Sequence, residues 1–197
     1  VEAGLRTGSL AEPWPEEFNR RMVDVIGDYL FAPTEQARDN LLAERLTGQI
    51  HVTGNTVIDA LQVVAGQLDQ HPALREQIDG RLPWLAPDAR MVLVTSHRRE
   101  NFGKGLEDIC EALIAIARHA DAEVIYPVHL NPQVRVPVER MLGGVPRIHL
   151  IAPQDYLGFV RLMQRASVVL TDSGGVQEEA PSLGKPVLVM RDVTERP

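Results

Sequence analysis

The chain has 197 residues, of which 44% are hydrophobic, 24% charged and 5% aromatic, with 15 Gly and 14 Pro. This composition is that of an ordinary globular protein and excludes collagen-like, low-complexity and strongly disordered classes. The formal net charge of −7 argues against a protein that binds nucleic acid or an anionic membrane. No apolar run approaches the roughly 20 residues of a membrane helix. The single cysteine, Cys110, excludes an intramolecular disulfide, so a reducing, cytoplasmic setting is expected.

From about residue 28, short β-rich runs alternate with helical patterns. Thr34 is the expected N-cap of a helix that follows the first strand. Strands are predicted at 28–32, 50–53, 91–95, 124–126, 148–151, 167–170 and 186–189. Further helices are predicted from about residue 55 and at 106–118, 156–165 and 175–182. Strands that are apolar on both faces and joined by helices predict an α/β fold with a doubly wound parallel sheet. Residues 69–90, which contain Pro72, Gly80, Pro83 and Pro87, interrupt the pattern and are the expected linker.

The first candidate site is a strand that runs through Ser-Gly-Gly into a helix. Thr171-Asp172-Ser173-Gly174-Gly175 leads directly into Val176-Gln177-Glu178-Glu179. Glycine lets the backbone approach a ligand closely, and the N–H groups at a helix start attract phosphate. The spacing matches neither a dinucleotide fingerprint nor a P-loop. A simple strand–helix turn with a serine N-cap is the alternative, and the shape alone does not separate the two.

The second candidate is the basic segment Ser96-His97-Arg98-Arg99-Glu100-Asn101-Phe102-Gly103-Lys104-Gly105, which follows a predicted strand. Open α/β sheets bind ligands at the carboxyl ends of their strands, and three cationic side chains with a histidine suit a diphosphate. The adjacent arginines should disfavour protonation of His97 and keep it available as a proton acceptor or donor. A solvated surface loop is the alternative interpretation.

The third candidate is a pair of carboxylates, Glu2 and Glu16. Pro13-Trp14-Pro15 fixes an extended approach to a helix start, where Glu16 and Glu17 are electrostatically favourable. Helix-terminus electrostatics alone explains this segment. A functional interpretation pairs Glu2 with Glu16 as acid and base across a substrate.

The other histidines and the cysteine carry weaker signals. His129 follows the strand at 124–126 and either binds an anion or is a hydrogen-bonded loop residue. Cys110 lies on a predicted helix between Ile109 and Glu111 and is expected to be a packing residue. The remaining histidines show no metal-ligand spacing, so no metal site is predicted. They are His51, His71, His119 and His149.

Six segments, in this order, resemble those of non-hydrolysing UDP-N-acetylglucosamine 2-epimerases: VEAGLRTG, PWPEEFNR, HVTGNTVIDAL, SHRRENFGKG, PVHLNP and TDSGGVQEEAPSLGKPVLVMRDVTERP. The match covers essentially the whole chain. It implies two Rossmann-like domains arranged as in GT-B glycosyltransferases, both incomplete here, with the substrate in the cleft between them. Residues 1–68 would end the N-terminal domain, 69–90 would cross over, and 91–197 would form most of the C-terminal, UDP-binding domain.

The resemblance also implies a reaction, the interconversion of UDP-GlcNAc and UDP-ManNAc by an isomerase that uses no NAD or metal. Simple removal of the C2 proton would be slow because that proton is not acidic. The family instead eliminates UDP across C1–C2 to give bound 2-acetamidoglucal, then adds UDP back with the proton on the other face. Such a route needs acid/base groups near both faces of the sugar and stabilisation of the departing diphosphate. The product feeds cell-envelope polysaccharide synthesis.

By motif, the resemblance implies catalytic roles for Glu2, Glu16 and His97. Bacterial members bind a second UDP-GlcNAc as an allosteric activator, and a homodimer is expected for the full-length protein. The implied UDP contacts are Gln154 and Phe159 beside the uracil, Ser173, Gly174 and Gly175 at the diphosphate, Glu179 at the ribose, and Arg196. The candidates for the activator site are Arg98, Arg99 and His129.

The ends of the chain predict an internal piece of a longer protein. The chain opens at Val1-Glu2 without an initiator Met or a signal segment, and stops at Arg196-Pro197 after an apolar run. The early part of the family's N-terminal domain, with a catalytic aspartate, and the end of its C-terminal domain have no counterpart. A sheet without its opening strands exposes apolar edges, so the 197 residues alone are expected to be inactive and marginally stable. The alternatives are a GT-B glycosyltransferase, a hydrolysing epimerase and a non-catalytic UDP-sugar-binding remnant.

Overall fold

A computed structural model of the chain describes residues 1–11, 13–81 and 89–196. Their contacts divide into two compact units, Val1–Asp59 with Asp192–Pro197, and Ala60–Arg191. In these described residues, no helix combines the length and the apolar character needed to cross a bilayer.

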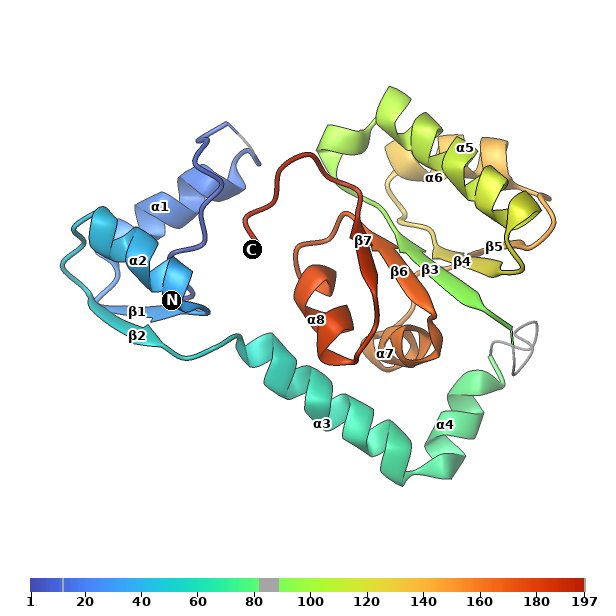
Figure 1. Ribbon diagram of the computed structural model, residues 1–197, viewed down its shortest axis with the longest axis horizontal. Helices are drawn as coiled ribbons and strands as arrows, with labels where there is room; N and C mark the ends of the chain where they lie inside the picture. The colour runs from blue at the N-terminus through green and yellow to red at the C-terminus, as the bar shows by residue number, and fades with distance from the viewer. Residues whose placement is uncertain (12, 82–88, 197) are drawn as a thin grey trace. The chain divides into compact units, whose positions relative to one another are not determined.

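The first unit is built on two parallel strands with a third extended segment beside them (Figure 1). Its elements are α1 (Glu16–Ile26), β1 (Tyr29–Ala32), α2 (Glu35–Ala43) and β2 (Gln49–Val52). Residues 1–3 run parallel to the free edge of β1, where Phe31 N donates to Val1 O at 2.8 Å and Ala3 N donates to Phe31 O at 3.0 Å. Thr34 caps α2, since its hydroxyl accepts from Ala37 N at 3.1 Å, which confirms the expected N-cap. The buried side chains are Ala3, Leu30, Ala32, Ala37 and Leu41.

The second unit is a five-stranded parallel sheet among the described residues, with strand order β5-β4-β3-β6-β7. In chain order its elements are α3 (Thr56–Gln70), which begins in the first unit, α4 (Pro72–Asp79), β3 (Met91–Thr95), the 3₁₀ turn η1 (Arg99–Asn101), α5 (Lys104–His119), β4 (Glu123–Pro127), α6 (Pro132–Leu142), β5 (Ile148–Ile151), α7 (Tyr156–Arg165), β6 (Val168–Thr171), α8 (Val176–Ser182) and β7 (Val187–Val189). The chain builds outward from β3 to β5, then returns to the other side of β3 with β6 and β7. The order therefore reverses between β3 and β6, and such switch points are where open α/β sheets bind ligands.

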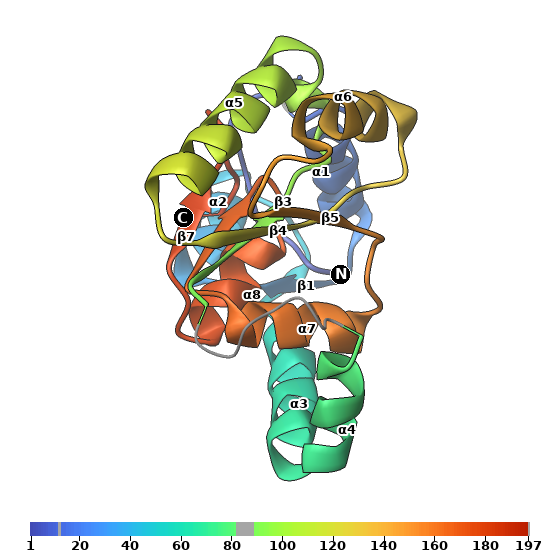
Figure 2. The same cartoon turned by 90° about the vertical axis from the view of Figure 1, so that its right-hand side faces the viewer.

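Helices cover both faces of this sheet, as the two ribbon views show (Figures 1 and 2). Successive residues of a strand point to opposite faces, so Met91 and Leu93 pack with α3, α4, α7 and α8, whereas Val92 and Val94 pack with α5 and α6. The two buried clusters explain why the central strands are apolar on both faces. This arrangement confirms the predicted α/β fold with parallel, doubly wound strands.

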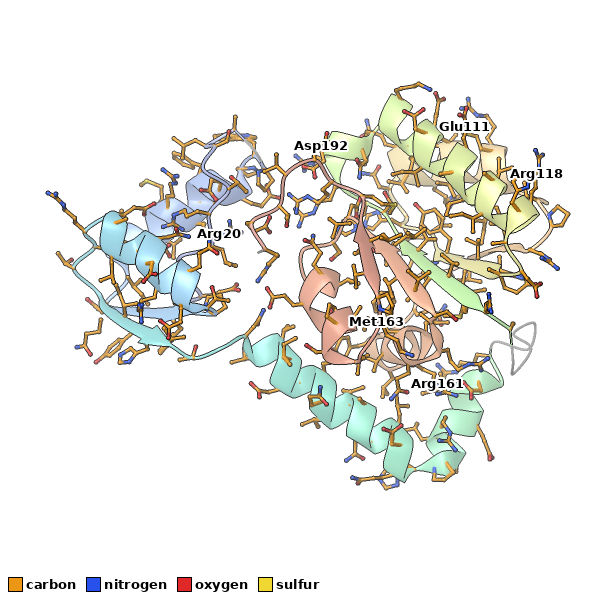
Figure 3. The ribbon with its side chains drawn as sticks, viewed as in Figure 1. Arg20, Glu111, Arg118, Arg161, Met163 and Asp192 are labelled. Carbon is orange, nitrogen blue, oxygen red and sulfur yellow. The ribbon has the colours of Figure 1, made fainter. Side chains whose placement is uncertain are left out.

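A bidentate ion pair ties α4 to α7 (Figure 3). Arg161 Nε lies 2.7 Å from Asp79 Oδ1, and Nη2 lies 2.6 Å from Oδ2. Arg161 points from α7 toward the end of α4, and Ile78 beside Asp79 is buried in the shared cluster. Together these contacts fix the α4 segment on the sheet.

Several predicted elements agree with the structure and two helices had not been predicted. The predictions for 148–151 and 156–165 coincide with β5 and α7. The helices α4 and α6 each begin at a proline, and α6 contains a second one, Pro137. The helix α4 falls inside the predicted linker 69–90, whose residues 82–88 lie outside the described part of the chain. The contact-based units divide at Asp59/Ala60, and the domain bounds inferred from the sequence stay a prediction.

Candidate functional site

A buried carboxylate joins two candidate segments at the switch point of the second unit. Asp172, which follows β6, is fully buried, and its Oδ2 accepts from Ser96 Oγ at 2.9 Å. The same oxygen accepts from the backbone N–H groups of His97 and Arg98, both at 2.9 Å, and from Asn101 Nδ2 at 3.0 Å. Charge-assisted bonds of this kind satisfy a buried carboxylate and hold a loop firmly. The basic segment is therefore an ordered loop anchored to the start of the Ser-Gly-Gly turn.

The imidazole of His97 lies between two other titratable groups. Its Nδ1 is 3.4 Å from Asp172 Oδ1, and its ring stacks on that of His129 with centroids 5.7 Å apart. Burial lowers the pKa of His97 below its ordinary value; the Asp172 carboxylate opposes this, and the charges of Arg98 and His129 add to it. The expectation that an adjacent arginine disfavours the protonated ring thus holds for Arg98, with burial as the larger cause. Arg99 is exposed on η1.

The Ser173-Gly174-Gly175 turn follows Asp172 and leads into α8. Ser173 N donates to Thr171 Oγ1 at 3.0 Å, and Thr171 Oγ1 lies 3.2 Å from Thr95 Oγ1 on the neighbouring strand. The N-cap of α8 is Gly175, so the expected serine N-cap is wrong, while a simple strand–helix turn and a phosphate-binding turn both remain as interpretations. The φ of Gly175 is −65°, a value that any residue adopts, so the backbone conformation does not by itself require glycine there.

Glu179, one turn into α8, is a buried carboxylate with one aromatic partner. Tyr156 Oη donates to Glu179 Oε1 at 3.1 Å. Burial raises the pKa of Glu179, the hydrogen bond from Tyr156 opposes the rise, and the charge of Glu178 adds to it. Gln154 is half-buried and donates to Ala152 O at 2.7 Å, while Phe159 packs partly against the buried cluster beneath α7.

In the first unit, Glu2 lines a cavity of about 520 Å³ near the carboxyl ends of β1 and β2. Its Oε1 is 3.5 Å from Arg196 Nη1, so the structure brings together two residues that the sequence analysis had placed in one substrate site. The other residues that line the cavity are Val1, Phe31, Thr53, Gly54, Asn55, Thr56 and Val57. Strand ends of parallel sheets are the usual place for ligands, which makes this the candidate site of the first unit.

Glu16 is the first residue of α1 and is exposed, while the next residue, Glu17, is fully buried. Glu17 accepts from Arg20 Nη1 at 3.1 Å and from Arg21 Nε at 3.2 Å. These contacts join the buried Glu17 carboxylate to two arginines one turn later and so stabilise the first turns of α1. The acid–base pairing of Glu2 with Glu16 stays a prediction.

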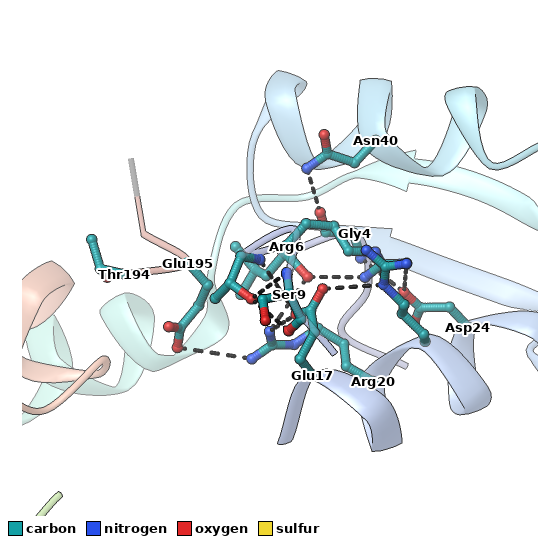
Figure 4. Close-up of polar contacts among 12 residues, drawn as sticks. Gly4, Arg6, Ser9, Glu17, Arg20, Asp24, Asn40, Thr194 and Glu195 are labelled. Atoms are coloured by element: carbon teal, nitrogen blue, oxygen red, sulfur yellow. Dashed lines mark hydrogen bonds and ion pairs between the residues drawn. The ribbon is translucent and has the colours of Figure 1, made fainter. Parts of the chain in front are cut away.

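A polar network surrounds Glu17 and connects α1 to the segment after Glu2 (Figure 4). Asp24 is almost fully buried, and its Oδ2 accepts from Gly4 N at 3.1 Å and from Arg6 Nη2 at 2.8 Å. Arg6 also pairs with Glu44 at 2.7 Å. Burial alone would lower the pKa of Arg6, but its bonds to Glu44 and Asp24 outweigh burial and raise it. The network therefore fixes the backbone next to Glu2.

Sequence reasoning assigned no role of their own to Asp172 and Asn101, which lie in the candidate segments, or to Tyr156 and Asp24. Asp172 carried one usable signal, because it stands where a buried strand ends and a glycine turn begins. Its partners belong to a segment some seventy residues earlier, which only the strand order brings next to it. Among the described residues, no group of three or more His, Cys, Asp or Glu side chains is placed to hold a metal ion.

Comparisons with known proteins agree with this geometry. A family model described as UDP-N-acetylglucosamine 2-epimerase matches residues 1–197. The UDP-N-acetylglucosamine 2-epimerase of Escherichia coli (strain K12) is 58% identical over 199 residues, covering 100% of this chain and 53% of that protein. The crystal structure of the Neisseria meningitidis UDP-GlcNAc 2-epimerase bound to UDP-GlcNAc matches with a TM-score of 0.96 and 48% sequence identity. The match covers 100% of this chain and 53% of that one. The crystal structure of the Methanocaldococcus jannaschii UDP-GlcNAc 2-epimerase in complex with UDP-GlcNAc and UDP matches with a TM-score of 0.87 and 36% sequence identity. The match covers 100% of this chain and 54% of that one. The chain thus spans about half the length of these relatives.

Proposed function

Because the chain belongs to the UDP-N-acetylglucosamine 2-epimerase family, we propose that a protein containing it interconverts UDP-GlcNAc and UDP-ManNAc without net hydrolysis. The observation that carries the proposal is the junction at the switch point of the second unit. There Asp172 holds the His97 loop against the Ser173-Gly174-Gly175 turn. Backbone N–H groups, a histidine and arginines at one strand edge are suited to a diphosphate.

The proposed reaction is an elimination followed by a re-addition. A base removes the C2 proton, the C1–C2 double bond forms, and the C1–O bond breaks with its electron pair leaving on UDP. The reverse addition delivers the proton to the opposite face of C2. Glu2 and Glu16 are the proposed acid/base pair, and His97 acts near the departing diphosphate. Each step conserves UDP, so nucleotide is not released as a product.

The proposed UDP contacts are those that the motif resemblance implies, with Arg196 among them. Ser173, Gly174 and Gly175 bind the diphosphate, and Glu179 accepts hydrogen bonds from the ribose hydroxyls. Buried carboxylates that accept hydroxyl donors discriminate strongly against ligands without them. Gln154 and Phe159 are proposed to lie beside the uracil.

Regulation, assembly and location are further parts of this proposal. Arg98, Arg99 and His129 are proposed to bind an activating second UDP-GlcNAc. A homodimer and a cytoplasmic location are proposed for the protein at the full length of its relatives. Turnover is proposed for that longer protein, and the 197 residues alone are expected to be inactive.

Proton NMR of UDP-GlcNAc in D2O tests the reaction directly. In a protein of the relatives' length that contains this chain, the C2 proton signal should disappear while UDP-ManNAc signals grow and free UDP stays absent. Glu16→Gln should reduce this rate by about 100-fold or more, since general acid–base catalysis contributes that much, while UDP binding persists. Glu35→Gln, an exposed carboxylate of α2 that pairs with Arg38, is the matched control and should leave turnover unchanged.

The same spectra separate the alternatives. Accumulation of free ManNAc and UDP would identify a hydrolysing epimerase, and transfer of the sugar to an added acceptor would identify a glycosyltransferase. Broadened uridine signals without any C2 exchange in the longer protein would leave only a UDP-sugar-binding role. An unchanged rate in Glu16→Gln would remove Glu16 from the mechanism.

A further inference from the structure

The two oxygens of the Asp172 carboxylate face different partners. Oδ2 is saturated, because it accepts from Ser96 Oγ, two backbone N–H groups and Asn101 Nδ2, all between 2.9 and 3.0 Å. Oδ1 shares the backbone N–H of His97 at 3.1 Å and otherwise faces Nδ1 of the same residue at 3.4 Å. An ionised carboxylate is an acceptor only, so the ring nitrogen that faces it favours the protonated state.

The His97 ring is partly exposed, and its position beside this oxygen is supported by the neighbouring ring and by its own backbone. One face stacks on His129, with an angle of 23° between the ring planes. Its backbone is fixed by Asp172, and Asn101 in the same loop also donates to Met190 O at 3.1 Å. The charged and titratable groups that face the ring are Asp172 from the end of β6, His129 from the segment after β4, and Arg98 in its own loop.

We propose that Asp172 is a positioning residue that holds His97 with Nδ1 protonated toward the buried carboxylate, so that Nε2 is the nitrogen offered to the ligand. In an imidazole, the partner of one nitrogen decides the tautomer and hence the chemistry of the other. Nε2 is then the atom that takes up or releases a proton beside a diphosphate. The identity of that ligand rests on the proposed function, whereas the tautomer does not.

The competing explanation is that Asp172 only staples the loop. A purely structural role would account for the four hydrogen bonds to Oδ2 but would not determine which nitrogen of the His97 ring carries the proton. Tautomer and titration of His97 therefore distinguish the two, because loss of a staple lowers stability without selecting a nitrogen. The variants Asp172→Asn and Ser96→Ala form a matched pair. Both remove polar bonds within one cluster, but only the first removes the negative charge.

The experiment is long-range ¹H–¹⁵N NMR of the histidines in the whole 197-residue chain, with the His97 signals identified by their loss in His97→Gln. Wild-type His97 should be the Nδ1–H tautomer when neutral. Asp172→Asn should mix the tautomers and lower the pKa of His97, because the carboxylate favours the protonated ring. Ser96→Ala should keep both the tautomer and the pKa of the wild-type chain.

A neutral Nε2–H tautomer in the wild-type chain would overturn the proposal, as would equal changes in the two variants. If Asp172→Asn fails to fold, the wild-type tautomer alone decides. None of these signals needs substrate, so they stand apart from the test of the reaction. If the Nδ1–H tautomer is found but the longer protein shows no C2 exchange and forms no UDP-ManNAc, the proposed function fails while the positioning of His97 holds.

Discussion

The hydroxyl of Tyr156, at the start of α7, donates a 3.1 Å hydrogen bond to the buried carboxylate of Glu179 in α8. Glu179 is the carboxylate proposed to bind the ribose, and its ionised form is the stronger acceptor for hydroxyl donors. Burial works against ionisation, and Tyr156 works for it. A contact between α7 and α8 thus favours the ionised form of the proposed ribose-binding residue.

Replacing Tyr156 by Phe is expected to raise the pKa of Glu179 further, because the opposing hydrogen bond is lost. A carboxyl whose folded pKa is raised adds stability below its unfolded pKa, and this contribution is lost as pH rises through the folded pKa. In Tyr156→Phe that loss should extend to higher pH than in the wild-type chain. Carbon-13 titration of the Glu179 carboxyl measures the shift. Glu178→Gln is the opposite control and should lower the pKa of Glu179, since it removes a neighbouring negative charge.

Arg161→Met is expected to destabilise the α4 segment by about 1 kcal/mol, because it breaks a bidentate, partly buried pair with Asp79. Hydrogen exchange of the α4 amides measures this loss. Arg81→Met removes an exposed ion pair with Asp155 at 3.4 Å and should change stability by less than about 0.5 kcal/mol. Equal effects of the two substitutions would show that Arg161 contributes no more than a surface charge.

The Arg161 pair also predicts a pH dependence. The hydrogen bond from Arg161 lowers the pKa of Asp79 below its ordinary value of 3.8; burial opposes this, and the charges of Arg161, Arg165 and Arg75 add to it. A carboxyl with a depressed folded pKa contributes stability above its unfolded pKa and loses it as pH falls through the folded pKa. The difference between wild type and Arg161→Met should therefore be constant near neutrality and shrink below about pH 3.8. A difference that persists in acid would contradict the pairing.

Gly4→Ala is expected to cost ~2 kcal/mol or more and to disorder the segment next to Glu2. Gly4 has a φ of +86°, and a methyl group placed on it would overlap the carbonyl group of Ala37 in α2. Gly8→Ala is the control, because Gly8 has a similar φ of +83° with open space around the added methyl. The control should cost only the roughly 1–2 kcal/mol of left-handed strain. Thermal unfolding monitored by backbone NMR of the first unit compares the two.

The pKa of His97 should lie below 6.5 in the wild-type chain, chiefly because the partly buried ring is partly desolvated. Arg98→Gln should raise it, since the arginine charge disfavours the imidazolium. A histidine with a depressed folded pKa loses stability as pH falls below its unfolded pKa, so Arg98→Gln should also weaken this acid sensitivity. Arg99→Gln removes the neighbouring exposed arginine and should leave the NMR titration of His97 unchanged. A shift of the same size in both variants would rule out a specific effect of Arg98.

Elements with strong local patterns were predictable from the sequence. The strand at Ile148–Ile151, the helix at Tyr156–Arg165 and the Thr34 cap all depend on residues within a few positions of each other. Apolar runs and capping chemistry are local, and so the sequence alone is sufficient for them.

The helices α4 and α6 were not predicted, and both begin at a proline. Pro132 stands in the first turn of α6, where a missing N–H costs nothing, and Pro137 is accommodated inside the helix. The apolar spacing of α6 was nonetheless helical, since Val134, Val138 and Leu142 recur every four residues and are all buried. Periodicity was the better guide there.

The role of Asp172 was not predictable for a different reason. Its four donors lie between 71 and 76 residues earlier in the chain, and nothing local indicates that β6 pairs with β3. Individual motifs at the site were visible in the sequence, but the residue that joins them depends on strand order.

This long separation also fixes when the site can form during folding. The loop from Ser96 to Asn101 directly follows β3, but Asp172, which anchors it, reaches the loop only when β6 pairs with β3. Contacts between residues so far apart form late, because the intervening loop has to be closed first. The amide protons of His97 and Arg98, both bonded to Asp172, should therefore gain protection from exchange only when the central strands have paired, which makes them reporters of the pairing of β3 with β6.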